Sequence, residues 1–155
     1  MIYSFDTCSL VEPWQRNLPP DILPSLWSDL LPRLVQDGHL HATEEVKVEL
    51  ERQEDDLLEW VEQQAGLFVE VDEAVQVAVS EILASHPKLV SARSMRSGAD
   101  PFVIALARVE DCAVVTEENP RSVVNPKIPD VCAAYGVRCI KMVDLIREQG
   151  WSFRH

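Results

Sequence analysis

The sequence predicts an α/β fold, a three-layer α/β/α sandwich around a mostly parallel central sheet. Short β-prone runs alternate with helical patterns, and this alternation is typical of strands that pair in parallel through helical crossovers. The length of 155 residues suits one domain, residues 1–155. Hydrophobic residues make up 46% and charged residues 26%, as in ordinary globular chains, so neither disorder nor a coiled coil explains the composition.

The first elements are a strand and an amphipathic helix. Residues 2–5 are β-prone and end at Asp6, where polar residues take over. A proline-rich loop is expected next. Leucines at helical spacing over 23–34 then predict an amphipathic helix, which Gly38 ends.

Capping residues and breakers predict the elements that follow. After a brief apolar stretch around Leu40, Thr43 is expected to cap a helix that runs to about Gln53. Asp100 suits the cap and Pro101 the first position of a helix that is almost wholly apolar. The other predictions are helices at 57–61, 72–85, 129–135 and 143–149, and strands or extended segments at 67–71, 112–115 and 137–140.

The cytoplasm is the expected location of the chain. Its first ten residues lack the basic region of a secretory signal, and no apolar run approaches the roughly 18 residues of a membrane span. Cys8, Cys112, Cys132 and Cys139 form neither a CxxC pair nor a Cys/His ligand spacing. This argues against a disulfide scaffold and against a structural zinc site.

One crevice is expected to collect several carboxylates. In a parallel sheet, ligands bind beyond the carboxyl ends of the strands. Carboxylates gathered there without matching bases raise one another's pKa unless a divalent cation lies among them. The pattern therefore predicts a Mg²⁺ or Mn²⁺ site suited to activating water against a phosphodiester. The candidates are Asp6 after the first strand, Glu45 or Glu49 on the helix after Thr43, Asp100, and Glu117 and Glu118 after the strand at 112–115.

Four segments, in this order, resemble the PIN-domain nucleases, which include the toxins of bacterial toxin–antitoxin pairs. They span almost the whole chain and read YSFDTCSL, EEVKVELER, GADPFVIALA and VVTEENP. The proline-rich insert at 11–24 is longer than in the compact VapC-type toxins. The PSLW that ends this insert and the IPDVC near the C-terminus resemble a distinct PIN-like branch.

The resemblance implies a metal-dependent endoribonuclease that uses Mg²⁺ or Mn²⁺ and is the toxin of a type II toxin–antitoxin pair. Asp6, Glu49, Asp100 and Glu118 match the family's acids, although Glu118 stands where Asp is commoner and is expected to bind directly or through water. The implied partners are RNA, a cognate DNA-binding antitoxin and a second copy of the chain, with no membrane; the residues alone leave DNA open as substrate. Supporting or alternative residues are Thr7, Ser9, Glu45, Thr116 and Glu117.

Charge is divided unevenly along the chain. Residues 1–85 carry 4 basic and 18 acidic side chains, net -14, whereas residues 86–155 carry 10 basic and 8 acidic side chains, net +2. Since phosphate binding relies on clustered Lys and Arg, the second half is expected to face RNA. The candidate RNA-binding residues are Arg93, Arg96, Arg121 and Lys127.

Two other enzyme classes fit the sequence less well than a nuclease does. A haloacid-dehalogenase-like phosphatase also begins with a strand and an Asp, but it needs a second Asp where Cys8 stands. A dinucleotide-binding sheet needs a G-x-G-x-x-G turn, which the chain lacks. The alternative that stays open is a PIN fold without a metal site that serves as an interaction module, which the acidic surface favours.

Overall fold

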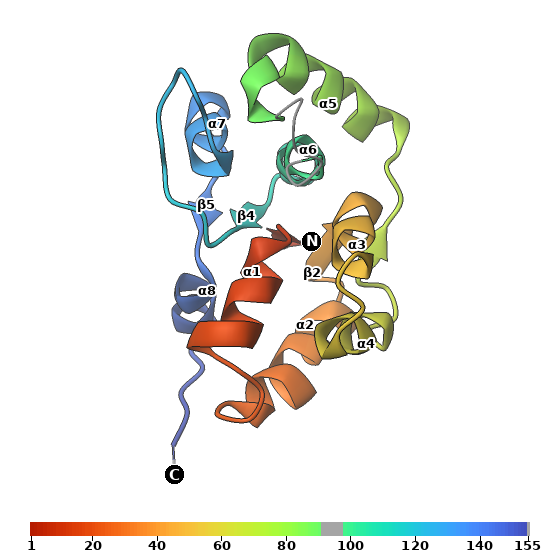
Figure 1. Ribbon diagram of the computed structural model, residues 1–155, viewed down its shortest axis with the longest axis vertical. Helices are drawn as coiled ribbons and strands as arrows, with labels where there is room; N and C mark the ends of the chain where they lie inside the picture. The colour runs from red at the N-terminus through yellow and green to blue at the C-terminus, as the bar shows by residue number, and fades with distance from the viewer. Residues whose placement is uncertain (91–97, 155) are drawn as a thin grey trace.

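A parallel sheet forms the centre of the protein (Figure 1). The computed structural model describes residues 1–90 and 98–154, and within them the sheet has five strands in the order β3-β2-β1-β4-β5. Every neighbouring pair is parallel, and Tyr3 in the first strand lies between Leu40 and Ala113 of its two neighbours. The strands are β1 Tyr3–Phe5, β2 Leu40–Thr43, β3 Phe68–Val69, β4 Ala113–Val115 and β5 Cys139–Ile140.

Helices cover both faces of this sheet and complete three layers, which confirms the predicted fold class. They are α1 Cys8–Glu12, α2 Leu31–Gln36, α3 Glu44–Glu51, α4 Asp56–Glu62, α5 Glu73–Ser85, α6 Asp100–Glu110, α7 Ile128–Tyr135 and α8 Met142–Glu148. In Figure 1, α5, α6 and α7 lie above the sheet, and α1, α2 and α8 lie below it. Among the described residues, no helix combines the length and the apolar character needed to cross a membrane.

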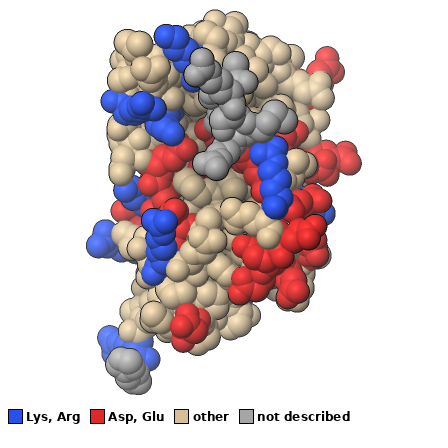
Figure 2. Space-filling model, in the orientation of Figure 1, with Lys and Arg blue, Asp and Glu red and all other residues tan. Residues whose placement is uncertain are grey.

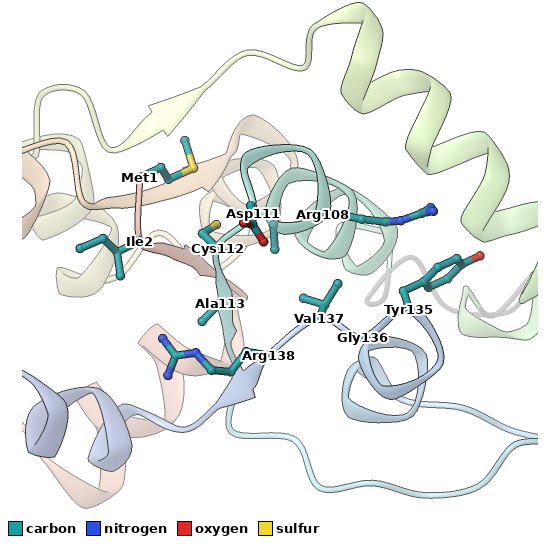
Figure 3. Close-up of a pocket in the computed structure, with 11 residues that line it drawn as sticks. Met1, Ile2, Arg108, Asp111, Cys112, Ala113, Tyr135, Gly136, Val137 and Arg138 are labelled. Carbon is teal, nitrogen blue, oxygen red and sulfur yellow. The ribbon is translucent and has the colours of Figure 1, made fainter.

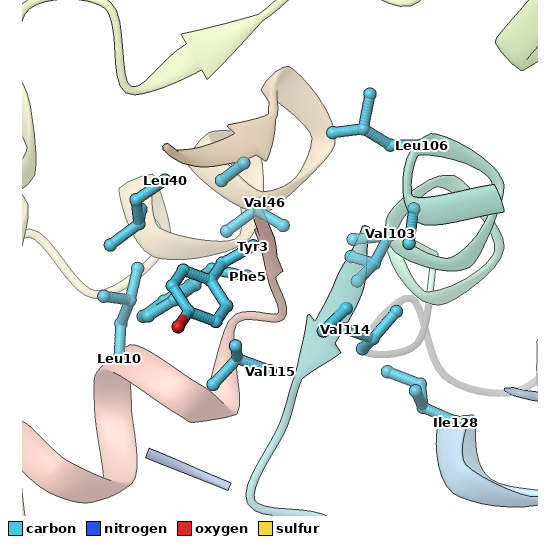
Figure 4. Close-up of a cluster of buried hydrophobic side chains, with 14 of the residues drawn as sticks. Tyr3, Phe5, Leu10, Leu40, Val46, Val103, Leu106, Val114, Val115 and Ile128 are labelled. Carbon is cyan, nitrogen blue, oxygen red and sulfur yellow. The ribbon is translucent and has the colours of Figure 1, made fainter. Parts of the chain in front are cut away.

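Side chains alternate across β1 and build the core on both faces. Tyr3 and Phe5 are buried on the face that α1 covers (Figure 4). Ser4 points to the opposite face, where its buried hydroxyl donates a hydrogen bond of 2.9 Å to the Val103 carbonyl of α6. Because its apolar side chains are packed and its buried hydroxyl is satisfied, β1 places the next residue, Asp6, in a fixed position.

The proline-rich loop expected after β1 is confirmed at residues 18–23, which contain Pro19 and Pro20, whereas the part of the insert up to residue 17 is helical. α1 continues directly into a π-helical turn, Pro13–Asn17. Trp14 packs edge-on against Trp27, with ring centroids 4.9 Å apart, and Trp27 packs against Trp60 at 5.1 Å. This packing joins residues far apart in sequence and overrides the local signal of the prolines.

Three smaller expectations need correction, and the other predicted elements are confirmed to within three residues at each end. The apolar stretch around Leu40 is the strand β2, whose four residues alternate between apolar and polar but are too few to predict a strand. Thr43 does precede α3, but among the described residues its buried hydroxyl has no hydrogen-bond partner. Asp100 is the first residue of α6, and Ala99 is the cap residue.

Candidate metal centre

Four carboxylates meet beyond the carboxyl ends of the central strands. They line one cavity of about 680 Å³ and come from the end of β1, from α3, from the first turn of α6 and from the segment after β4. Their positions follow from the parallel sheet, which brings the ends of β1 and β4 to the same edge. The four residues are Asp6, Glu49, Asp100 and Glu118. A fifth carboxylate of the cavity lining, Glu12 of α1, forms an ion pair of 3.5 Å with Arg16.

Asp6 is the most tightly held of these residues. It is 2% exposed, and its Oδ1 accepts a hydrogen bond of 2.7 Å from the backbone N–H of Thr7. Its Oδ2 accepts hydrogen bonds of 2.8 Å from both the Cys8 thiol and the Thr116 hydroxyl. Ser9 donates from its hydroxyl to the Asp6 carbonyl. Thr116, Thr7 and Ser9 therefore fix the rotamer and the backbone of Asp6.

Glu49 is the acid of α3 that faces the cavity. Thr7 donates to its Oε1 over 2.6 Å, which joins the end of β1 to α3. Its Oε2 is buried without a hydrogen-bond partner among the described residues. Glu45, one turn earlier, also has a buried and unpartnered Oε2, but within the described chain it is not part of the cavity lining. The geometry thus favours Glu49 as the second acid of the site.

Replacing Glu49 by Gln should weaken Mn²⁺ binding by at least about tenfold, since losing even an outer-shell partner of a metal site has an effect of this size. Glu45→Gln is the matched control, because it makes the same chemical change one helical turn away. Isothermal titration of both variants with Mn²⁺ measures the difference. A larger loss in Glu45→Gln would make Glu45 the ligand and contradict the assignment.

The two acids after β4 point to different helices. Glu118 lines the cavity, and its Oε2 accepts a hydrogen bond of 3.2 Å from the N–H of Ile128, the first residue of α7. Glu117 instead accepts a hydrogen bond of 3.1 Å from the N–H of Met142, the first residue of α8. A carboxylate at a helix N-terminus stabilises that helix. Glu117, considered as an alternative ligand, therefore caps α8.

Asp100 is the carboxylate with the least compensation. It is 5% exposed and lines the cavity, yet no hydrogen bond or ion pair reaches its side chain from the part of the chain that the structure describes. Burial, and after it the nearby charges of Asp6, Glu118 and Glu49, raise the pKa of Asp100 to about 10, against a smaller opposing effect of Lys127. Without a cation, this carboxyl group holds a proton at neutral pH.

The other three acids are perturbed in the same direction. Burial raises the pKa of Asp6 despite the hydrogen bonds that it accepts. Burial also raises the pKa of Glu49 and of Glu118, and the charge of Asp6 adds to both effects. Four carboxylates that are difficult to ionise, one of them without a hydrogen-bond partner among the described residues, would be stabilised in their ionised form by a bound cation. Their oxygens are also the ligands that a hard divalent cation prefers.

Cys8 also belongs to this site, although the cysteine spacing indicated no metal-binding role. Its sulfur and one carboxylate oxygen each of Asp6 and Glu118 lie within 4.8 Å of one another. The backbone N–H of Glu117 donates to the Cys8 sulfur over 3.3 Å and holds it in place. The only sequence signal was the position of Cys8 two residues after Asp6.

The predicted RNA-binding residues are only partly placed. Arg93 and Arg96 lie outside the described residues. Arg121 and Lys127 lie in the segment between β4 and α7, and Lys127 is close enough to lower the pKa of Asp100 and of Glu118. Figure 2 shows Lys and Arg mainly on the side of α7 and α8, and Asp and Glu massed over α3 and α4. Arg52, which sequence reasoning did not single out, also lines the cavity.

A second cavity, of about 370 Å³, lies at the opposite edge of the sheet, where β1, β4 and β5 begin (Figure 3). Its two arginines extend away from each other. Arg108 pairs with Glu81 at 3.1 Å, and Arg138 forms two hydrogen bonds, of 2.7 and 3.2 Å, with Glu148. Both guanidinium groups of this cavity are therefore already paired with carboxylates.

Comparison with known proteins agrees with the architecture. The family described as "Domain of unknown function (DUF4411)" matches residues 3–153. Among solved structures, FitAB bound to an IR36 DNA fragment is similar, with a TM-score of 0.56 and 15% identity over 99% of this chain and 99% of that chain. The likeness shows the fold, which is PIN-like. The search among curated proteins gives no match.

Proposed function

The chain belongs to the DUF4411 family, and we propose that it is a metal-dependent endoribonuclease that hydrolyses phosphodiesters at the four-acid cavity. The observation that carries the proposal is Asp100, a buried carboxylate without a partner among the described residues. An interaction module without a metal site would be more stable without this carboxylate, because its removal would eliminate both the cost of burying the group and its repulsion by the neighbouring acids.

Each residue has a distinct part in this proposal. Asp6, Glu49, Asp100 and Glu118 would hold Mg²⁺ or Mn²⁺, and Thr7 and Thr116 orient two of these acids. Such a cation supplies water activation and neutralises charge on the phosphodiester.

The direct test is cleavage of a labelled single-stranded RNA by the purified protein. We expect fragments with Mn²⁺ or Mg²⁺, none with EDTA, and restored cleavage when excess metal is added back. A DNA strand of the same sequence tests the substrate class. Metal binding without cleavage of either strand would favour a metal-binding interaction module, and the absence of metal binding would remove the proposed centre altogether.

We also propose that the chain is the toxin of a toxin–antitoxin pair, an inference that rests on the resemblance to PIN-domain toxins. The structural neighbour FitAB is bound to a DNA fragment. In this chain the acidic field over α3 and α4 opposes DNA on that face, so DNA contact would come from a partner protein (Figure 2). Co-purification with the product of an adjacent small reading frame tests this pairing.

Replacing Arg121 and Lys127 together by Ala should weaken RNA binding and flatten its salt dependence. Each phosphate contact on a single strand contributes about 0.7 to the slope of log K against log salt, so losing both lowers the slope by about 1.4. The measurement is a salt titration of RNA affinity in an inactive background. Arg33→Ala is the control, because Arg33 is paired with Asp29 on α2. An unchanged slope in the double variant would show that Arg121 and Lys127 do not contact the RNA phosphates.

A further inference from the structure

A thiol stands inside the acidic centre, where a hard cation has no need of one. Cys8 Sγ lies within 4.8 Å of a ligand oxygen of Asp6 and of Glu118, and all three groups are buried or half-buried. Mg²⁺ and Mn²⁺ prefer oxygen donors, whereas thiolate sulfur selects softer ions such as Zn²⁺. The donor set therefore suits two different classes of metal.

The spacing of the three groups fits one tetrahedral ion. Zinc binds sulfur at about 2.3 Å and carboxylate oxygen at about 2.0–2.2 Å, so two ligands of one ion lie roughly 3.5 Å apart. The Cys8 sulfur lies 2.8 Å from Asp6 Oδ2, and every pair of ligand atoms among the three groups lies within 4.8 Å, so the three groups are close enough together to share one ion. Independently of these three groups, the unpaired Asp100 carboxylate lines the same cavity and supplies a further oxygen and a negative charge.

We infer that Asp6, Cys8 and Glu118 form a zinc-binding mode of this centre that excludes the hard cation. Since both modes use Asp6 and Glu118, Zn²⁺ and Mn²⁺ compete for one place. On Zn²⁺ binding a metal–sulfur bond forms, and the thiol proton of Cys8 passes to solvent. The inference rests on the proposed function in one respect only, that the displaced ion is the one that supports hydrolysis, so Zn²⁺ acts as an inhibitor.

Cobalt(II) is the probe that tests the ligand set without an activity assay. Thiolate bound to Co²⁺ gives a near-ultraviolet charge-transfer band that carboxylates do not give. We expect this band in the wild-type protein, its loss in Cys8→Ser, and its removal when Zn²⁺ is added. Cys112→Ser and Cys139→Ser are the matched controls, since these thiols lie outside the cavity lining and should leave the band intact.

Competition titrations give the magnitude. In Cys8→Ser the ratio of Zn²⁺ to Mn²⁺ affinity should fall by at least about tenfold, the least that loss of a metal partner produces. Glu118→Gln provides a second variant and should weaken Zn²⁺ binding while keeping the band. No band in wild type, or a band lost in Cys139→Ser and kept in Cys8→Ser, overturns the inference.

The two proposals fail separately. A thiolate band together with no metal-dependent cleavage keeps the zinc mode and removes the nuclease. Mn²⁺-dependent cleavage with no thiolate band keeps the nuclease and removes the zinc mode.

Discussion

Asp100→Asn should lower Mn²⁺-dependent RNA cleavage by about a thousandfold or more. The substitution keeps the shape of the side chain and removes one charged oxygen donor. Metal ions stabilise the transition state of hydrolysis by several kcal/mol, and each 1.4 kcal/mol lost is about a tenfold loss of rate. A single-turnover assay at saturating RNA measures the effect. Cleavage within about tenfold of wild type would place the chemistry elsewhere.

The same variant should be more stable than the wild type in EDTA. The Asp100 side chain is ionised in the unfolded chain, but in the folded protein it is buried without a partner among the described residues and close to Asp6, Glu118 and Glu49. Folding at neutral pH therefore requires the uptake of a proton at an energetic cost, and a neutral amide removes that cost. Thermal unfolding in EDTA should show a higher Tm. Asp21→Asn is the control, since Asp21 is exposed in the insert. A lower Tm in Asp100→Asn alone would show that Asp100 serves as a structural acceptor.

Asp6→Asn provides a useful contrast, although Asp6 is also buried and acidic. The Asp6 carboxylate accepts hydrogen bonds from Thr7, Cys8 and Thr116. An amide replaces one of these acceptor oxygens with a donor, and breaking a satisfied buried network costs stability. The gain in stability is therefore expected at Asp100 and not at Asp6.

The sequence was sufficient to predict that the acids lie near one another, but not which acid of each pair of candidates lines the cavity. A strand that ends in Asp6 and a segment that follows β4 with Glu118 must share an edge once the sheet is parallel. Glu49 and Glu45 lie on one helix one turn apart, and only the packing of α3 shows which of them faces the cavity. The local sequence does not determine how α3 is rotated about its own axis.

Long-range contacts explain the remaining differences. The first part of the insert is helical because Trp14 packs on Trp27, which in turn packs against Trp60 of α4. Glu117 and Glu118 are adjacent and identical in type, and they diverge because the N-terminus of α8 takes one and that of α7 takes the other. The Cys8 thiol lies in the acidic cavity because it forms hydrogen bonds with both Asp6 and Thr116, which are far apart in sequence.

Without metal, the protein should lose stability as the pH rises from about 5 to about 8. Asp100 has its pKa raised from 3.8 to about 10, so the folded state binds its proton more firmly than the unfolded state does. A group of this kind contributes most below its unfolded pKa, and that contribution declines as the pH rises toward the folded value. Glu49 and Glu118 are shifted in the same direction.

The slope of this loss approaches about 1.4 kcal/mol per pH unit for each proton that the folded state retains. His41 opposes it, because its pKa is lowered by burial and it adds stability as the pH rises through its usual range. Glu148 and Asp130 have lowered pKa values and act only in more acidic solution. The pKa of Tyr3, raised to about 12, lies above the window.

Urea unfolding at several pH values, in EDTA and in saturating Mn²⁺, isolates the carboxylates from these other groups. In EDTA the wild-type free energy of unfolding should fall with pH, and Asp100→Asn should remove most of the fall. In Mn²⁺ the sign should reverse for the wild type, because a cation binds the ionised acids and gains affinity as protons leave. A wild-type curve that rises with pH in EDTA would mean that the acids are ionised and compensated without metal, which would favour a PIN-like interaction module over a nuclease.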